Sequence, residues 1–345
     1  MAKGDRNSGW TGFFRAFTVL CAIILLLAQR YLDLTAPGAG ARQVLSVCEG
    51  LTLWTVPALF LLWGMFSLEE GKPQVSASLL GLALPALGTL VFWGVVYAIA
   101  SQLLEGGALT WSGVWDALAS AVRGDTYHHL RILYPLIGLY LVHPVVHRFV
   151  SSASRGELRY FLGLCFLFAY ALPLLPGIFG RFSFAASLLM QLDVHLVLGW
   201  VGCYVGGWYL RHFEISRIAE YLLYILGVLG LVLSVANPYS ALSFRQDTSL
   251  PAALTAAALC ALFRYVLGVS EERSRRRAVS QIGDCAFGVY LIHPLWLLVL
   301  QRLGVSPLSL SPALSIPLFA VVLFVLSLPF AWLISLIPGI GTKLV

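Results

Sequence analysis

The stretch YHHLRILYPLIGLYLVHPVVHRF, from Tyr127 to Phe149, decides the class of fold. Its middle is apolar and long enough to cross a bilayer, since a transmembrane helix needs about 20 mainly apolar residues. It also carries four histidines and two arginines. Ionisable side chains are costly in lipid. These histidines and arginines therefore lie at the solvated ends of a helix, form hydrogen bonds inside a bundle, or line a buried reaction site.

The composition of the whole chain is typical of a protein embedded in a membrane. Of 345 residues, 59% are hydrophobic and 11% are charged, with a mean hydropathy of +0.86. A soluble domain carries about 25% charged residues. The net charge of +6 fits a bias in cytoplasmic loops better than binding to nucleic acid. We expect an all-α, polytopic transmembrane bundle that forms a single integral-membrane domain over residues 1–345.

About ten spans are predicted when apolar runs of roughly 20 residues are marked along the chain. They cover residues 12–29, 50–68, 79–101, 131–150, 158–176, 193–210, 218–236, 249–268, 282–301 and 313–336. The first is expected to be an uncleaved span, because the small residues at Pro37–Ala41 lie too far beyond it for a signal-peptide cleavage site. The segment 102–130, with Trp111 and Trp115, is expected along the membrane interface.

The distribution of Lys and Arg predicts the orientation. With the N-terminus inside, 14 of the 22 basic residues lie on the cytoplasmic side and 7 on the opposite side, with Arg264 inside a span. This bias favours two cytoplasmic termini. The densest run, SEERSRRRAVS (Ser270–Ser280), is interpreted as a stop signal in contact with headgroups, with a phosphate-binding rim as the alternative.

Three positions are candidates for chemistry. His128, His129 and Arg131 lie at the outer mouth of the fourth span, where an imidazole either is solvated or faces the interior and moves protons. His293 falls near mid-bilayer, beside Pro294, and is either a proton-transfer group or a structural hydrogen bond. Arg15, at the cytoplasmic edge of the first span, either snorkels or holds a phosphate.

The inner end of the fourth span holds His147 and Arg148, with His143 one turn deeper. We interpret this inner pair as charged ends that extend into the headgroups. The six cysteines are scattered singly, so their spacing indicates neither disulfides nor a zinc site, and no metal is expected.

Four segments in order resemble the integral-membrane acyltransferase 3 family of bacterial sugar O-acyltransferases, including the branch that acetylates enterobacterial common antigen. SVCEGLTLWTVPALFLLWGMFSL is similar to the family's second span through Val56, Pro57, Phe60 and Gly64. TYHHLRILYPLIGLYLVHPVV keeps the family's pattern of a histidine, leucines, Tyr140 and Pro144. LVLGWVGCYVGGWYL and VSQIGDCAFGVYLIHPL resemble two later segments.

The resemblance implies an acyltransferase in the bacterial inner membrane. Its donor would be cytoplasmic acetyl-CoA or another acyl-CoA, and its acceptor a hydroxyl of a cell-surface or lipid-linked glycan. His129 and His293 are then the catalytic candidates, and Arg15 binds coenzyme A. We assign Arg131, Tyr134, Tyr290, Asp193 and His195 to the substrate cavity. Expected partners are membrane lipid, the glycan and acyl-CoA; the oligomeric state is left open.

Two departures from the family pattern fall on residues that would carry the chemistry. The first span normally holds Arg-x10-His, but ten residues after Arg15 lead to Leu26, and Gln29 is the nearest polar side chain. Leu53 stands where an arginine is usual. The alternative is therefore a catalytically degenerate member that transports a glycan or acyl group, or a non-catalytic partner in glycan assembly.

Overall fold

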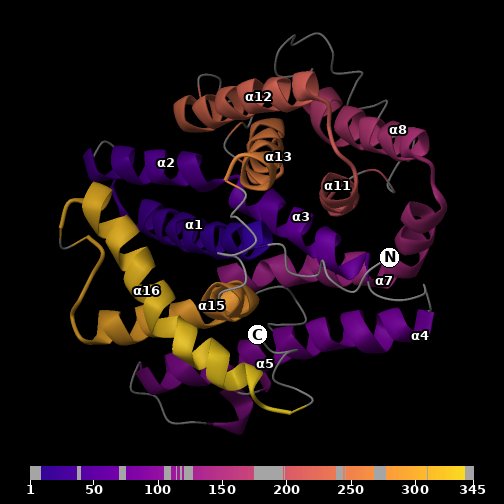
Figure 1. Ribbon diagram of the computed structural model, residues 1–345. Helices are drawn as coiled ribbons and strands as arrows, with labels where there is room; N and C mark the ends of the chain where they lie inside the picture. The colour runs from indigo at the N-terminus through magenta and orange to yellow at the C-terminus, as the bar shows by residue number, and fades with distance from the viewer. Residues whose placement is uncertain are drawn as a thin grey trace. The chain divides into compact units, whose positions relative to one another are not determined.

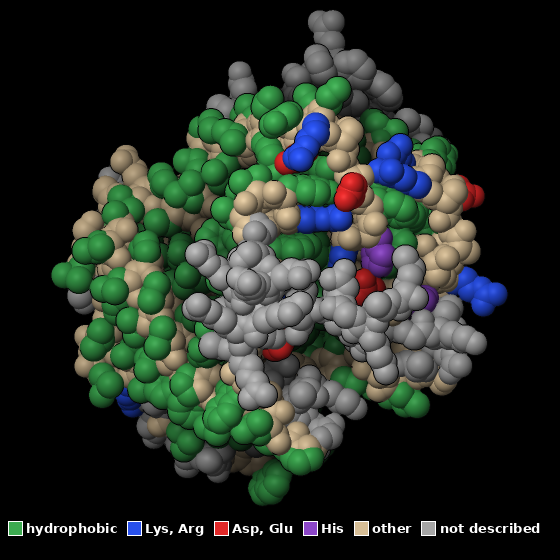
Figure 2. All heavy atoms as spheres, in the orientation of Figure 1, with side chains coloured by type: hydrophobic (Ala, Val, Ile, Leu, Met, Phe, Trp, Pro, Cys, Tyr) green, Lys and Arg blue, Asp and Glu red, His purple; other side chains and the backbone are tan. Residues whose placement is uncertain are grey.

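The computed structural model describes residues 9–36, 40–69, 75–104, 127–174, 199–237, 246–267, 277–308 and 310–338, with isolated positions at 110–113, 115–116, 119, 197 and 244. Every regular element in these ranges is a helix (Figure 1), which confirms the all-α fold. Hydrophobic side chains cover most of the described surface that Figure 2 shows, as expected of a protein in lipid. The chain divides into two compact units.

The first unit comprises residues 1–49, 75–141 and 269–345. Its main helices are α1 (Gly9–Leu34), α5 (Leu84–Leu104), α15 (Arg277–Arg302) and α16 (Pro312–Ser335), with the short 3-10 helix η2 (His128–Ile132). In this unit α1 packs on α15 and α16, α15 also packs on α16, and both α5 and η2 contact α15. Helix α15 is therefore at the centre of the first unit. A short helix α4 (Val75–Ser78) and a π-helical segment η1 (Leu79–Ala83) lead into α5.

The second unit comprises residues 50–74 and 142–268. Its helices are α3 (Thr55–Ser67), α8 (Arg155–Cys165), η3 (Phe166–Ala171), α11 (Val201–His212), α12 (Arg217–Ala236) and α13 (Leu250–Tyr265). Helix α3 packs on α11 and α13, α12 packs on α13, and α8 packs on α11. Two helices, α2 (Gly40–Thr52) and α7 (Leu133–Ser152), contribute residues to both units.

Eight helices within the described ranges are long and apolar enough to cross a membrane. They match eight of the ten predicted spans. The span predicted for 50–68 begins ten residues earlier, because α2 and α3 together form one stretch, Gly40–Ser67. The spans predicted for 193–210 and 249–268 correspond to shorter helices, α11 with 12 residues and α13 with 16.

Several helices of the second unit begin at a serine that caps them. Ser154 accepts a hydrogen bond from the backbone N–H of Glu157, and the Glu157 carboxylate accepts one from the N–H of Ser154. Ser216 and Ser249 accept from the third backbone N–H after them. Each cap satisfies a donor that the first helical turn leaves open.

Candidate functional site

A cavity of about 310 Å³ lies in the first unit, between α1, η2 and α15. Helix α1 lines it with Leu26, Leu27, Gln29, Arg30, Asp33 and Leu34. The opposite wall consists of Tyr127, His128 and His129 and, from α15, His293, Pro294 and Leu297. Arg30, Asp33 and Leu34 are exposed, so the cavity opens at the C-terminal end of α1.

Helices α1 and α15 run parallel, and contacts at both ends fix their register. Near their N-termini, Arg15 forms an ion pair with Asp284 at 3.2 Å. Near their C-termini, Gln301 donates a hydrogen bond to the hydroxyl of Tyr31 at 2.8 Å. The two contacts join residues 269 and 270 positions apart, so the offset is nearly constant along the pair. This register places the C-terminal half of α1 beside His293.

Pro294 determines how His293 is held. A proline has no backbone N–H, so the carbonyl of Tyr290, four residues earlier, loses its helical donor. The Nδ1 atom of His293 lies 2.7 Å from this carbonyl oxygen. Because a carbonyl only accepts hydrogen bonds, Nδ1 must carry the proton. In the neutral ring, Nε2 then has the free lone pair and can act as a base.

His129 is buried, with 4% of its surface exposed, among aromatic rings. Its ring centroid lies 4.8 Å from that of Tyr97, 6.0 Å from that of Tyr290 and 5.8 Å from that of His293. The hydroxyl of Tyr290 donates to the backbone oxygen of His129 at 2.9 Å, which fixes η2 against α15. The Nε2 atom of the His129 ring is buried and has no hydrogen-bond partner among the described residues. A buried polar atom left in this way costs about 1–3 kcal/mol.

The structure brings together three of the predicted site residues, His129, His293 and Tyr290. Arg15 does not line the cavity; it lies eleven residues before Leu26 on α1, about 16 Å along the helix axis. Arg131 is exposed and Tyr134 half-buried, and neither lines the cavity. Asp193 and His195 lie outside the described residues.

Arg30 and Asp33 of the cavity wall were missed by sequence reasoning, whereas Leu26 and Gln29 had been singled out. Leu26, Gln29, Arg30 and Asp33 form one stripe of α1, with the i, i+3, i+4, i+7 spacing of a single helix face. That spacing was the sequence signal that could have shown that these side chains share one face of the helix. Gln29 also donates to the Glu49 carboxylate at 3.3 Å. Leu26, where the family pattern has histidine, faces the same cavity as the two histidines.

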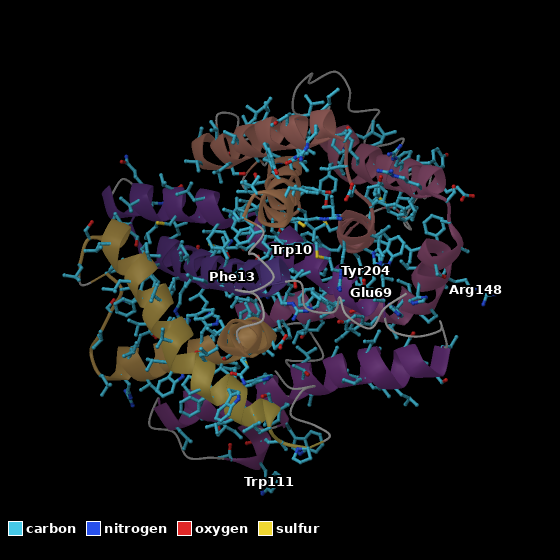
Figure 3. All side chains as sticks on the ribbon, viewed as in Figure 1. Trp10, Phe13, Glu69, Trp111, Arg148 and Tyr204 are labelled. Carbon is cyan, nitrogen blue, oxygen red and sulfur yellow. The ribbon has the colours of Figure 1, made fainter. Side chains whose placement is uncertain are left out.

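The interpretation of the inner end of the fourth span was half wrong. Arg148 is exposed, as predicted (Figure 3), but His147 is 5% exposed and His143 is 3% exposed. In the second unit, the Nδ1 of His143 lies 2.9 Å from the hydroxyl of Tyr204 on α11, and the rings of His143 and His147 are 5.4 Å apart. His143 is therefore held by a contact with α11 and His147 packs beside His143, so neither imidazole is an exposed helix end.

Comparison with known families identifies the class of protein. The profile of the acyltransferase 3 family, described as an acyltransferase domain, matches residues 9–336. The chain therefore belongs to this family and is a membrane acyltransferase by fold and family. No curated protein matches it. No solved structure matches it either.

Proposed function

We propose that the protein transfers an acetyl or similar acyl group from cytoplasmic acyl-CoA to a hydroxyl of a cell-surface or lipid-linked glycan, in a bacterial inner membrane. The observation that carries the proposal is the pair His129 and His293, with ring centroids 5.8 Å apart beside one cavity. Two imidazoles at this distance can act on the same hydroxyl group. Neutral imidazole is the side chain best suited to general-base catalysis near pH 7.

The proposed step needs no metal or redox group. Nε2 of His293 takes the proton from the sugar hydroxyl as the oxygen attacks the thioester carbonyl carbon. A C–O bond forms, the C–S bond breaks, and the coenzyme A thiolate leaves with the proton that the imidazolium returns. His129, whose Nε2 has no partner among the described residues, holds the reacting oxygen. The sequence favoured His129 as the base; the fixed tautomer of His293 now favours His293.

Arg15 is proposed to bind the phosphates of the donor. Its guanidinium, with 25% of the side chain exposed, is paired with Asp284, whose side chain is 54% exposed. Exposed ion pairs contribute little to stability, so a phosphate can replace the carboxylate. The distance of about 16 Å along α1 then separates the phosphate end of the donor from its reacting thioester.

The proposal is tested by incubating membranes that contain the protein with radiolabelled acetyl-CoA and following the label into glycolipid. We expect label in the lipid-linked glycan fraction, and none with the His129→Ala, His293→Ala double variant. Label equal to that of membranes without the protein would contradict the proposal.

A degenerate scaffold that transports a glycan or acyl group is the second candidate, and Leu26 favours it. This side chain lines the cavity at the position where the family pattern has histidine. The Leu26→His variant separates the two candidates. If the unmutated protein transfers no acyl group and Leu26→His does, the scaffold has lost its catalytic group. If both transfer, His129 and His293 suffice.

A further inference from the structure

We infer that the cavity accepts a single, uncharged sugar ring, and that Asp33 and Arg30 recognise it. This inference rests on the proposed transfer to a glycan and names the class of acceptor. It starts from the stripe of α1 that faces the two histidines. Along this stripe the side chains change from apolar Leu26 to ionisable Arg30 and Asp33 toward the open end of the cavity.

The Asp33 carboxylate is available to a ligand. It lines the cavity and, among the described residues, takes part in no hydrogen bond or ion pair. Arg30 lies one turn before it and, within the described part of the chain, donates only a long hydrogen bond, 3.5 Å, to the Gln301 side chain. A carboxylate accepts from hydroxyl groups and a guanidinium donates to them. The pair can therefore bind neighbouring hydroxyls of one ring.

The charges at the cavity favour an uncharged acceptor. Arg30 and Asp33 are the only formally charged groups in the wall formed by the described residues, and their charges cancel. Because Arg30 and Asp33 already balance each other, an acidic sugar would add a net negative charge to a partly dehydrated site, where its carboxylate could pair with Arg30 only in competition with Asp33. The hydroxyls of a neutral sugar can bind both the Asp33 carboxylate and the Arg30 guanidinium without adding a charge to the site. Asp33 thus selects against acidic sugars as well as binding neutral ones.

The size and walls of the cavity limit the acceptor to one ring. Its volume of about 310 Å³ is at the lower end of the range of about 300–1,000 Å³ for small-molecule sites. The ring of Tyr127 and the side chains of Leu27 and Leu297 provide apolar wall. The apolar C–H face of a sugar packs against such surfaces while its hydroxyls reach Asp33. Any remaining glycan extends through the open end, at Leu34.

The test compares a matched pair of acceptors, a methyl hexoside and the corresponding methyl hexuronide, with the purified full-length protein and acetyl-CoA. We expect the unmutated protein to prefer the hexoside in kcat/KM by roughly tenfold or more, the scale of one unfavourable charge contact. Asp33→Asn keeps the shape but removes the charge. It should raise KM for the hexoside and reduce the preference to about threefold or less, with KM for acetyl-CoA unchanged.

Asp116→Asn is the matched control, because Asp116 is an exposed carboxylate outside the cavity wall; it should leave the preference unchanged. An equal preference in Asp33→Asn and the unmutated protein, or a native preference for the hexuronide, overturns the inference while leaving acyl transfer intact. If no acyl transfer occurs, the proposed function fails, and thermal stability in millimolar methyl hexoside decides the inference. The hexoside should then raise the Tm of the unmutated protein and not that of Asp33→Asn; equal shifts, or none, overturn it.

Discussion

Pro294 shows how one residue without side-chain polarity can orient the histidine that we propose as the base. It removes the backbone N–H that would otherwise occupy the Tyr290 carbonyl, and His293 takes that carbonyl with Nδ1. The histidine therefore has its tautomer and orientation fixed before a substrate arrives. The same residue gives the cavity part of its wall.

Single substitutions should show whether each histidine takes part in the proposed chemistry. We expect His293→Ala and His129→Ala each to lower acyl transfer by roughly 10²-fold or more, the scale of general-base catalysis. His128→Ala should have a milder effect, because His128 is exposed whereas His129 is buried. Rates of transfer in membranes with equal amounts of folded protein check this. Equal small losses for His128 and His129 would mean that neither takes part in the chemistry.

Arg15 and Asp284 form a pair that allows a sharp test of donor binding. Arg15→Ala should weaken coenzyme A binding, and Arg15→Lys should weaken it less, since lysine keeps the charge but loses the planar fork. Asp284→Asn removes the same ion pair and leaves the guanidinium in place, so it should retain or improve affinity. Equilibrium binding of coenzyme A measures all three. Equal losses in Arg15→Ala and Asp284→Asn would make the pair structural.

At the scale of elements, glycine determines how closely helices of the second unit approach. A Cβ atom at Gly64 of α3 would overlap the backbone oxygen of Tyr204, and one at Gly207 of α11 would overlap that of Leu61. Each helix therefore presents a glycine to the backbone of the other. Close approach of this kind is how membrane helices gain van der Waals contact where lipid offers no hydrophobic driving force between them.

Adding one methyl group at these positions should force α3 and α11 apart. We expect Gly64→Ala and Gly207→Ala each to lower the free energy of unfolding by about 1–3 kcal/mol, the usual cost of overpacking. Gly206→Ala is the control in the neighbouring position, because its Cβ would meet only side chains at 3.6 and 3.8 Å. Thermal unfolding in detergent gives the ranking. A Tm for Gly207→Ala equal to that of Gly206→Ala would contradict the close approach.

The sequence predicted the elements better than their partners. Length and hydropathy located most spans, because the bilayer itself imposes both. They misplaced the start of the second span, since α2 is mixed in polarity and lies before the apolar run. His293 and His129 could be singled out as polar groups in apolar runs. The position of Asp33 in the cavity wall and the burial of His147 depend on which helices pack together. A local sequence pattern does not predict that packing.

At the scale of the whole molecule, the parallel register of α1 and α15 bears on topology. Two helices that run in the same direction across a bilayer must begin on the same side, so an even number of crossings separates their starts. This agrees with the excess of Lys and Arg on one side of the predicted spans. We therefore expect residues 274 and 343 on the cytoplasmic side.

Cysteine labelling in sealed vesicles checks this orientation. Of the native cysteines, five are buried and Cys48 is half-buried, so the five can stay in place and a protein without Cys48 is a suitable background. Ser274→Cys and Lys343→Cys should react with an impermeant reagent from the cytoplasmic side. Ser112→Cys, next to Trp111, which projects away from the helices in Figure 3, should react from the other side. Labelling of positions 274 and 343 from opposite sides would refute the topology.

The pairing of α1 with α15 also has a consequence for the order of assembly during synthesis. Arg15 leaves the ribosome long before Asp284, its partner 269 residues later, and His129 long before His293. The residues of the second unit are complete at position 268, whereas the first unit still lacks α15 and α16. Helix α1 is therefore in the membrane before α15 and α16, its main packing partners, have been synthesised. Long-range closure of this kind is slow, and a chain that stops after residue 268 would keep the second unit but never form the cavity.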